Sequence, residues 1–252
     1  MYFVPEIPHG YLQGICRQTK FALIIGAGSA GRAFGQALRG RANEDWRVAY
    51  TRRSSKAVHD LKQQLAAENI GGSNRDMVFS LDPSDEQQTM HLTGLLAGHG
   101  KFDLVVLAAG QAIFDNECID LAASHFSNFD ANVTAKAIPL QALLRQKCLA
   151  CDATVVVISS RVCDFESDDS RIATQKGYYA SIMTLEGWAR RMAAECSDKV
   201  KFEVLRMPLI VSPTAVRYQE EGVVPADYPL VDPLAYASEE LRRILALPVS
   251  TT

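Results

Sequence analysis

Three glycines near the beginning of the chain have the spacing of a phosphate-binding turn. Gly26, Gly28 and Gly31 form the pattern GxGxxG directly after the apolar run Phe21–Ile25. In such a turn the first glycine permits a tight bend, the second lets a pyrophosphate approach the backbone, and the third lets a helix pack closely on the preceding strand. Because helix N-termini attract anions, the pattern predicts dinucleotide binding; a glycine-rich turn with an empty site is the alternative. The residues expected to form the phosphate site are Gly26, Gly28, Ser29, Ala30 and Gly31.

The residues after the second apolar run distinguish between two dinucleotides. An NAD site has an Asp or Glu about 20 residues after the glycines, which binds the ribose 2′-hydroxyl. Here the run Arg47–Thr51 is followed by Arg52 and Arg53, and no carboxylate lies there. A guanidinium presents a planar fork of donors that suits a phosphate. We therefore expect NADP(H), held by Arg52 or Arg53 with help from Thr51 or Ser54; an exposed basic turn is the alternative.

Cys148 and Cys151 form a CxxC pair, which could be a redox pair, half of a zinc site, or two small residues at the end of a helix. The six cysteines of the chain are too few for a disulfide framework. No second CxxC or spaced histidine pair completes a set of zinc ligands. We therefore expect no metal site.

Short apolar runs alternate with longer amphipathic stretches along the chain. The expected strands are Phe21–Ile25, Arg47–Thr51, Met77–Ser80, Leu104–Leu107, Thr154–Ser159 and Phe202–Arg206. The expected helices are Ala33–Leu38, Lys56–Ala67, Asp85–Leu96, Ala131–Gln146, Tyr178–Glu195 and Asp232–Leu247. Such alternation predicts a single α/β domain built on a doubly wound parallel sheet with right-handed crossovers.

Two segments lie outside this alternation. Residues 1–20 precede the first strand and form either an N-terminal arm that packs on the body or a frayed terminus, so the domain itself is expected over residues 21–252. Residues 212–233 contain four prolines and are expected to be a loop. This loop would cap the binding site, to which its tyrosines Tyr218 and Tyr228 could contribute apolar surface.

The composition excludes several classes of protein. The chain has 26 Lys and Arg residues against 29 Asp and Glu residues, and the net charge of −3 leaves no basic stripe that would neutralise nucleic-acid phosphates. No apolar run reaches the roughly 18 residues that a membrane span requires. The N-terminus lacks the basic region and apolar core of a secretory signal. We therefore expect a cytoplasmic enzyme or binding domain that engages neither nucleic acid nor a membrane.

Further motifs, in the same order along the chain, resemble those of the short-chain dehydrogenases/reductases over about residues 20–213. Leu81-Asp82-Pro-Ser-Asp85 is similar to the acidic turn whose Asp meets the adenine, and Ala108-Ala109-Gly110 is similar to the end of the NNAG motif. Arg206-Met207-Pro208 is similar to the turn after the sixth strand. The resemblance implies a Rossmann-like fold that binds NADP(H). The additional cofactor residues that it implies are Asp82, Ala108, Ala109, Gly110 and Pro208.

The resemblance extends to the residues that carry out catalysis in this family. Asn132 matches the family's helix asparagine, Ser160 falls where the catalytic serine would, and Tyr178 begins a YxAS motif. These matches imply that Tyr178 gives or takes the proton, that Ser160 holds the substrate oxygen, and that Asn132 orders a water relay.

The chain departs from the family at one decisive position, because Ile182 stands four residues after Tyr178, where the family has lysine. The lysine ammonium favours the tyrosine phenolate by charge proximity, and isoleucine supplies neither charge nor donor. Lys176, Arg161 and Arg171 flank the site in sequence and could supply a cation. The glycine spacing, the AAG step, the long segment between Ser160 and Tyr178 and the absence of the usual final strand are further departures.

Two functions of different classes follow from these residues. The first is an NADP(H)-dependent oxidoreductase that acts on a carbonyl or alcohol of a small, apolar or aromatic substrate. The second is an inactive NADP(H)-binding regulator or interaction protein on the same fold, which the loss of the lysine favours. Non-redox chemistry such as dehydration in the same pocket is a third reading. Without the final strand, the sheet-extending interface of the family tetramer has no counterpart, which leaves a homodimer open.

Overall fold

A computed structural model describes residues 19–41, 44–68, 76–113, 121–165, 175–222, 224 and 226–246. Its six strands form one sheet in the order β3-β2-β1-β4-β5-β6, and every pair is parallel. The strands are β1 (Lys20–Ile25), β2 (Trp46–Arg52), β3 (Met77–Ser80), β4 (Phe102–Leu107), β5 (Leu149–Ser160) and β6 (Val200–Met207). All six predicted strands are therefore confirmed, and within the described residues the sheet ends at β6.

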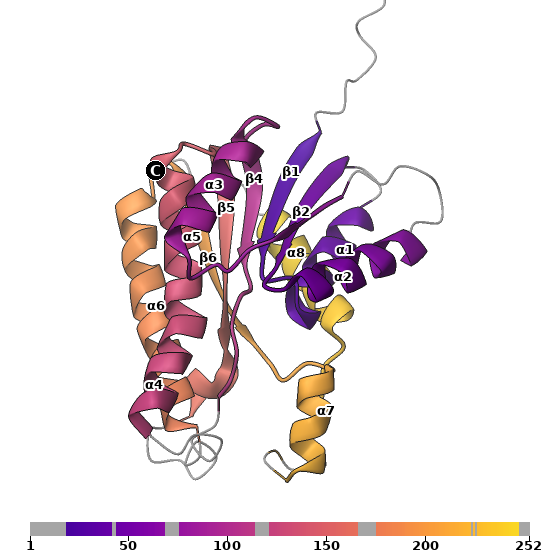
Figure 1. Cartoon of the computed structure of the whole chain (residues 1–252), viewed down its shortest axis with the longest axis vertical. Helices are drawn as coiled ribbons and strands as arrows, with labels where there is room; N and C mark the ends of the chain where they lie inside the picture. The colour runs from indigo at the N-terminus through magenta and orange to yellow at the C-terminus, as the bar shows by residue number, and fades with distance from the viewer. Residues whose placement is uncertain are drawn as a thin grey trace, which may run out of the picture.

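Helices cover both faces of the sheet (Figure 1). One face carries α1 (Ser29–Arg39), α2 (Ser55–Glu68) and α8 (Pro233–Ala246). The other face carries α3 (Glu86–Ala97), α5 (Ala135–Arg145) and α6 (Lys176–Cys196), and α4 (Leu121–Phe129) packs on α6. This three-layer arrangement confirms the predicted doubly wound α/β fold, whose strand order reverses between β1 and β4.

The apolar strand runs are continuous because both faces of the central strands are buried. Leu23 and Ile25 of β1 face the α5 and α6 side, whereas Ala22 and Ile24 face the α1 and α8 side. These side chains are at most 1% exposed. The sheet is thereby fixed from both sides, and the carboxyl ends of its strands form one edge on which a site can be built.

The helices differ from expectation at two places. The helix predicted over residues 131–146 begins with a π-helical turn, η2 (Asp130–Thr134), which continues from the unpredicted helix α4. The segment 212–233, predicted to be a loop, contains α7 (Pro213–Glu220), so that prediction was wrong. Ser212 caps this helix by accepting a hydrogen bond from the N–H of Ala215 at 3.1 Å, and a proline at the first helical position is a start signal rather than a breaker.

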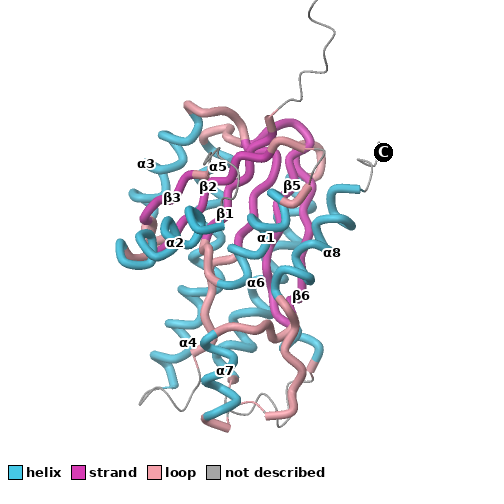
Figure 2. The backbone as a smooth tube through the Cα atoms, turned by 90° about the vertical axis from the view of Figure 1, so that its right-hand side faces the viewer, coloured by secondary structure: helices cyan, strands magenta, loops and turns pink. Residues whose placement is uncertain are grey.

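Figure 2 shows α4 and α7 at the same end of the molecule, beyond the sheet. This is the end where β1 and β4 finish, opposite the start of β1 (Figure 1). Most of the predicted N-terminal arm, residues 1–20, lies outside the described residues, as does Leu247 at the end of the last predicted helix.

A close contact between α1 and β2 fixes the first helix against the sheet. A β-carbon on Gly35 would lie 2.0 Å from the hydroxyl oxygen of Tyr50, a side chain that is completely buried. Real carbon atoms do not approach an oxygen so closely, so the ring of Tyr50 occupies the space that a side chain at position 35 would need.

We predict that Gly35→Ala lowers the free energy of unfolding by about 1–3 kcal/mol, because overpacking would displace the tyrosine ring or the helix. The matched control is Gly187→Ala in α6, where a β-carbon would meet nothing within 4 Å. That control should raise stability by about 0.5–1 kcal/mol through the higher helix propensity of alanine. Urea unfolding followed by circular dichroism measures both, and equal effects of the two substitutions would contradict the packing argument.

Candidate functional site

The glycine turn joins the end of β1 to the start of α1. Gly26 has a φ of +86°, and a β-carbon there would lie 2.4 Å from the backbone of Ala109. A β-carbon on Gly31 would lie 2.6 Å from the carbonyl oxygen of Gly26. These two glycines are therefore required by the close approach of α1 and β4 to the turn.

Gly28 differs from the other two glycines because its surroundings are open. The nearest atom to a β-carbon there would be a guanidinium nitrogen of Arg52, at 3.7 Å. Gly28 is also the N-cap of α1 and provides no side-chain cap. The first N–H groups of the helix, at Ser29 and Ala30, therefore face a space that is free to receive an anion.

The basic residues at the end of β2 lie beside this turn. Nη1 of Arg52 donates to the carbonyl oxygen of Ala27 at 2.6 Å, which holds the guanidinium against the glycine turn. Arg53 is more exposed, and its Nε lies 3.5 Å from Oδ1 of Asp82, two residues after the end of β3. The arrangement brings both arginines and Asp82 to one edge of the turn.

Thr51 and Ser54, the two hydroxyl residues expected to help bind the 2′-phosphate, have different surroundings. Thr51 is 1% exposed, and its Oγ1 accepts the N–H of Gly26 at 3.0 Å, so it supports the turn itself. Ser54 is exposed, and its Oγ accepts the N–H of Ala57 at 3.2 Å in the first turn of α2. Of the two, only Ser54 lies on the surface.

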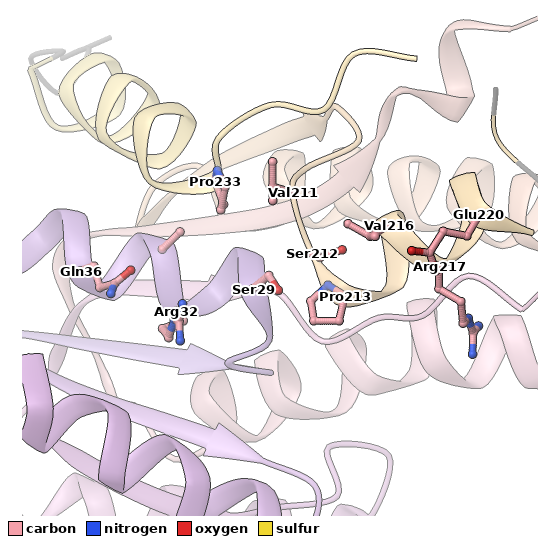
Figure 3. A pocket seen from close by; sticks show the side chains of 11 residues that line it. Ser29, Arg32, Gln36, Val211, Ser212, Pro213, Val216, Arg217, Glu220 and Pro233 are labelled. Atoms are coloured by element: carbon pink, nitrogen blue, oxygen red, sulfur yellow. The ribbon is translucent and has the colours of Figure 1, made fainter. Parts of the chain in front are cut away.

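A cavity of about 550 Å³ opens beside the start of α1 (Figure 3). Ser29 and Arg32 of α1 line one side, and Ser212 and Val216 line the other. The cavity therefore lies between the glycine-turn helix and α7. Pro208 follows β6 in the same chain segment and is partly buried.

The end of β4 packs against a polar cluster on η2 and α5. The N–H of Ala108 donates to the carbonyl of Ile25 at 2.8 Å, which joins the ends of β1 and β4. A β-carbon on Gly110 would lie 2.8 Å from Oδ1 of Asn132 and 3.2 Å from Nζ of Lys136. Gly110 thus lets these two polar side chains lie directly against the backbone.

Asn132 connects three chain segments from its place in the π-helical turn. Its Oδ1 accepts the N–H of Gln111 at 3.1 Å, and its Nδ2 donates to the carbonyl of Gln111 at 2.8 Å. Nδ2 also lies 3.2 Å from Oγ of Ser181 on α6. The buried amide therefore binds the extension of β4 to the helix that carries Tyr178.

Tyr178 and Ser160, predicted to act together, are brought together by α6 and the end of β5. Burial is the main influence on the Tyr178 hydroxyl and raises its pKa, while a hydrogen bond with Ser160 opposes this shift. The Cys163 thiol and the Tyr218 hydroxyl are also close enough to influence Tyr178. The hydroxyl of Tyr218 donates to the carbonyl of Ala112 at 3.0 Å, so α7 packs over this site.

Ile182 points into the apolar core between the sheet and α6, and its side chain is 2% exposed. Of the flanking cations considered from sequence, Arg161 and Lys176 are both exposed, and Arg171 lies outside the described residues. Sequence reasoning missed Lys136, which is buried beside Gly110. Its spacing of four residues from Asn132, on the same helical face, was the available signal.

A second group that sequence reasoning missed is Glu186, two turns after Tyr178 on α6. Its carboxylate accepts the hydroxyl of Ser159 at 2.7 Å and two N–H groups of Arg206 at 2.8 Å each. Nη1 of Arg206 also donates to Asp164 at 2.7 Å. Burial opposes the charge on Glu186, but the hydrogen bonds from Arg206 and Ser159 prevail and lower its pKa.

This carboxylate also affects Cys163, which lies between Glu186 and Tyr178. Burial, followed by the nearby charge of Glu186, raises the pKa of the Cys163 thiol to about 11. Cys163 is therefore a neutral, partly buried wall of the site rather than a nucleophile.

The CxxC residues lie at the beginning of β5, where Cys148 is buried and Cys151 is exposed. Among the described residues, no three His, Cys, Asp or Glu side chains gather as metal ligands would. In the same part of the chain, no helix combines the length and apolar character that crossing a membrane requires.

Comparison with known proteins identifies the family whose pattern this chain follows. A family model described as short chain dehydrogenase matches residues 20–221. No curated protein matches the sequence.

Several solved structures share the fold. An alcohol dehydrogenase from the archaeon Thermococcus sibiricus, complexed with 5-hydroxy-NADP, is 22% identical, covers 93% of each chain and superposes with a TM-score of 0.70. A short-chain dehydrogenase from Streptomyces avermitilis is 23% identical, with coverage of 92% of this chain and 87% of that one and a TM-score of 0.67. BdcA in complex with NADPH is 21% identical, with coverage of 91% and 87% and a TM-score of 0.67.

We predict that Glu186→Gln lowers the free energy of unfolding by about 2 kcal/mol at neutral pH, because hydrogen bonds between charged groups are lost. Since the folded state lowers the pKa of Glu186 below its ordinary 4.5, the advantage of the wild type is present above that pH and disappears as the pH falls through the folded-state pKa. Urea unfolding at several pH values measures the difference.

The matched control is Glu195→Gln, on the same helix, where the carboxylate is paired with Arg191 at the surface. It should change stability by less than about 0.5 kcal/mol. If Glu186→Gln lowers the free energy of unfolding by the same amount down to strongly acidic pH, the negative charge of the Glu186 carboxylate is not the cause.

Proposed function

The chain belongs to the short-chain dehydrogenase family, and from this premise we propose that it is an NADP(H)-dependent oxidoreductase that interconverts a carbonyl and an alcohol. The observation that carries the proposal is the meeting of two groups of residues at the carboxyl edge of the sheet. The open glycine turn with Arg52 lies at the ends of β1 and β2, and the cluster around Tyr178 lies at the ends of β4 and β5.

The residues at the glycine turn fit a dinucleotide that carries a 2′-phosphate. The uncapped start of α1 and the open space at Gly28 would receive the pyrophosphate. Arg52 and Arg53 would hold the additional phosphate, because the end of β2 carries two guanidiniums and no carboxylate of its own. Asp82 would lie near the adenine. The presence of 5-hydroxy-NADP and NADPH in two proteins of the same fold supports this choice.

When bound, NADP(H) supplies or accepts the hydride at the carbon of the substrate. The chain's own residues then have to bind the oxygen on that carbon and exchange a proton with it. Tyr178 would give its proton to the oxygen during reduction, Ser160 would hold the oxygen by a hydrogen bond, and Asn132 would keep the α6 helix in register with the end of β4. Because burial raises the pKa of Tyr178, its hydroxyl stays protonated through the neutral range, which suits a general acid.

The walls around Tyr178 favour a small apolar or aromatic substrate. Cys163 is neutral, and the ring of Tyr218 on α7 is 5% exposed with its hydroxyl already used by Ala112. A substrate with a second charge would meet no free partner on these residues. The helix α7 thus takes the capping role that was assigned to residues 212–233, with Tyr218 as its inward-facing side chain.

A second candidate function is an NADP(H)-binding protein without turnover. The observation that favours it is Ile182, because a buried apolar side chain stands where the family has its lysine. The cofactor residues serve both candidates equally, so turnover is the test that separates them.

Three further expectations belong to the same proposal. One domain over residues 21–252 would carry both sites, with residues 1–20 as an arm. Phe126, Phe129 and Met183 on the neighbouring helices α4 and α6 are 40% exposed or more and would suit a homodimer interface. The expected location is the cytoplasm.

We predict that Arg52→Ala combined with Arg53→Ala weakens NADPH binding by about 10²-fold or more, because each charge-assisted contact is worth about 1.5–3 kcal/mol. NADH binding should change by less than about threefold, since NADH lacks the 2′-phosphate. Fluorescence titration of both cofactors measures the difference, and Arg191→Ala at the exposed end of α6 is the control. Equal losses for NADPH and NADH would show that the arginines do not recognise the 2′-phosphate.

We predict that Tyr178→Phe lowers the rate of carbonyl reduction by about 10²–10⁴-fold without weakening NADPH binding, because only the proton donor is lost. Tyr179→Phe, the adjacent tyrosine on α6, is the matched control and should keep the rate. The measurement is NADPH oxidation across a panel of small apolar and aromatic carbonyl compounds. Wild-type turnover by Tyr178→Phe would overturn the mechanism, and a wild type that binds NADPH but reduces nothing would favour the second candidate.

A further inference from the structure

Lys136 is a buried amine that takes no part in the proton transfer proposed for Tyr178, Ser160 and Asn132. Its side chain is 2% exposed, and in the part of the chain that the structure describes its Nζ makes one hydrogen bond, to the carbonyl oxygen of Asn132 at 3.1 Å. An ammonium has three N–H donors, so a buried lysine with one acceptor is poorly compensated for its charge. Burial of such a charge lowers the stability of the folded state, and a role for the charge in function is one reason for a protein to keep it.

The position of Lys136 connects it to the proton donor. Asn132, whose carbonyl accepts from Lys136, has its Nδ2 3.2 Å from Oγ of Ser181. Oγ of Ser181 in turn donates to the carbonyl of Tyr178 at 2.7 Å. Ser181 is the residue directly before Ile182. Lys136 is thus bonded to the backbone of Asn132, and the side chain of Asn132 is linked through Ser181 to the backbone carbonyl of Tyr178, beside the position where the lysine is missing.

Two local features hold the amine there. The π-helical turn η2 ends two residues before Lys136, and the carbonyl of Asn132 within it accepts from Nζ. The missing side chain of Gly110 leaves the space that Nζ fills, because a β-carbon at that position would lie 3.2 Å from it. The amine consequently lies against the end of β4, where the cofactor is proposed to bind.

We infer that Lys136 supplies the positive charge of this active site, as a positioning residue that acts through Asn132 and Ser181 on Tyr178 and replaces the lysine missing at position 182. The inference rests on the proposed function. During reduction a hydride reaches the carbonyl carbon, the substrate oxygen takes the proton of Tyr178, and the phenolate that remains regains a proton from solvent. A buried phenolate is unfavourable, and an ammonium in the same low-dielectric region offsets its charge.

The charge state of Lys136 gives the inference a measurable pH dependence. Burial lowers the pKa of Lys136 to about 7, so the amine is charged below that pH and neutral above it. Reduction should therefore be fast at acidic pH and should decline as the pH rises through neutrality.

Few other groups near Lys136, Asn132, Ser181 and Tyr178 could make the reduction rate fall as the pH rises through neutrality. Burial keeps Tyr178 and Cys163 protonated through this range, and Glu186 is held as a carboxylate by Arg206. Tyr218 on α7 uses its hydroxyl on Ala112, and the end of β4 at Gly110 carries no charge. On α4, His125 lies beside Gly177, the residue before Tyr178, so its substitution serves as a control.

The test is the pH profile of NADPH-dependent reduction by the wild type and Lys136→Met, a substitution that keeps the length and removes the charge. We expect the variant to be about 10²-fold slower at acidic pH and to lose the decline near neutrality. His125→Gln should keep the decline. Lys201→Met, which removes a lysine whose Nζ donates to the carbonyl of Ile244 at 3.2 Å far from the site, should keep both rate and profile.

Two further measurements guard against a variant that simply fails to fold. Adding Ile182→Lys to Lys136→Met should recover at least about tenfold of the lost rate, because it returns a charge to the same region. In wild-type protein with ¹³C-labelled lysine, one methylene signal should titrate near neutrality and should be missing from Lys136→Arg.

The outcomes separate the inference from the function on which it rests. If the wild type reduces a carbonyl and Lys136→Met keeps the neutral decline, or if every lysine signal titrates only in the alkaline range, the inference is overturned and the proposed function stands. If the wild type reduces no carbonyl at all, the proposed function falls, and the role of Lys136 falls with it.

Discussion

The close contact between the glycine turn after β1 and the end of β4 is the constraint on which the site depends. Gly26 can adopt its positive φ and admit Ala109 only because it has no side chain, and Thr51 secures the turn from β2. This contact fixes the start of α1 relative to Gly110, and Gly110 in turn admits the polar cluster of η2 and α5. A phosphate site and a proton-transfer site are thereby built from the same few backbone atoms.

Several polar side chains inside the core take their hydrogen-bond partners from a neighbouring element. Asn132 satisfies the exposed backbone of Gln111, and Glu186 holds Ser159 and Arg206 together at the ends of β5 and β6. Lys136 is compensated less fully, because among the described residues its Nζ has one acceptor for three N–H donors. Incomplete compensation of this kind is expected at functional sites rather than in purely structural networks.

Much of this arrangement could be predicted from the sequence. Strands that are buried on both faces are continuous apolar runs, and the spacing of the glycines reflects positions where a β-carbon would collide with neighbouring backbone. The four prolines of residues 212–233 favour a loop, but Ser212 and Pro213 together are a helix start signal, and α7 begins there. The sequence places Lys136 on the same helical face as Asn132, but no local pattern shows what Glu186 and Lys136 contact. Their roles depend on Arg206 and Gly110, which are distant in sequence and come into contact only through the packing of α6 and α5 against the sheet.

The position of α7 has a consequence for access to the site. One face of this helix lines the cavity beside Ser29 and Arg32, and its Tyr218 reaches across to Ala112 near Tyr178. A single short helix therefore borders both the phosphate end of the cofactor site and the substrate end. The position of α7 therefore limits access to the substrate and to the dinucleotide together. A change in the length or packing of α7 would consequently alter both ends of the site at once, so cofactor and substrate access cannot be tuned separately on this fold.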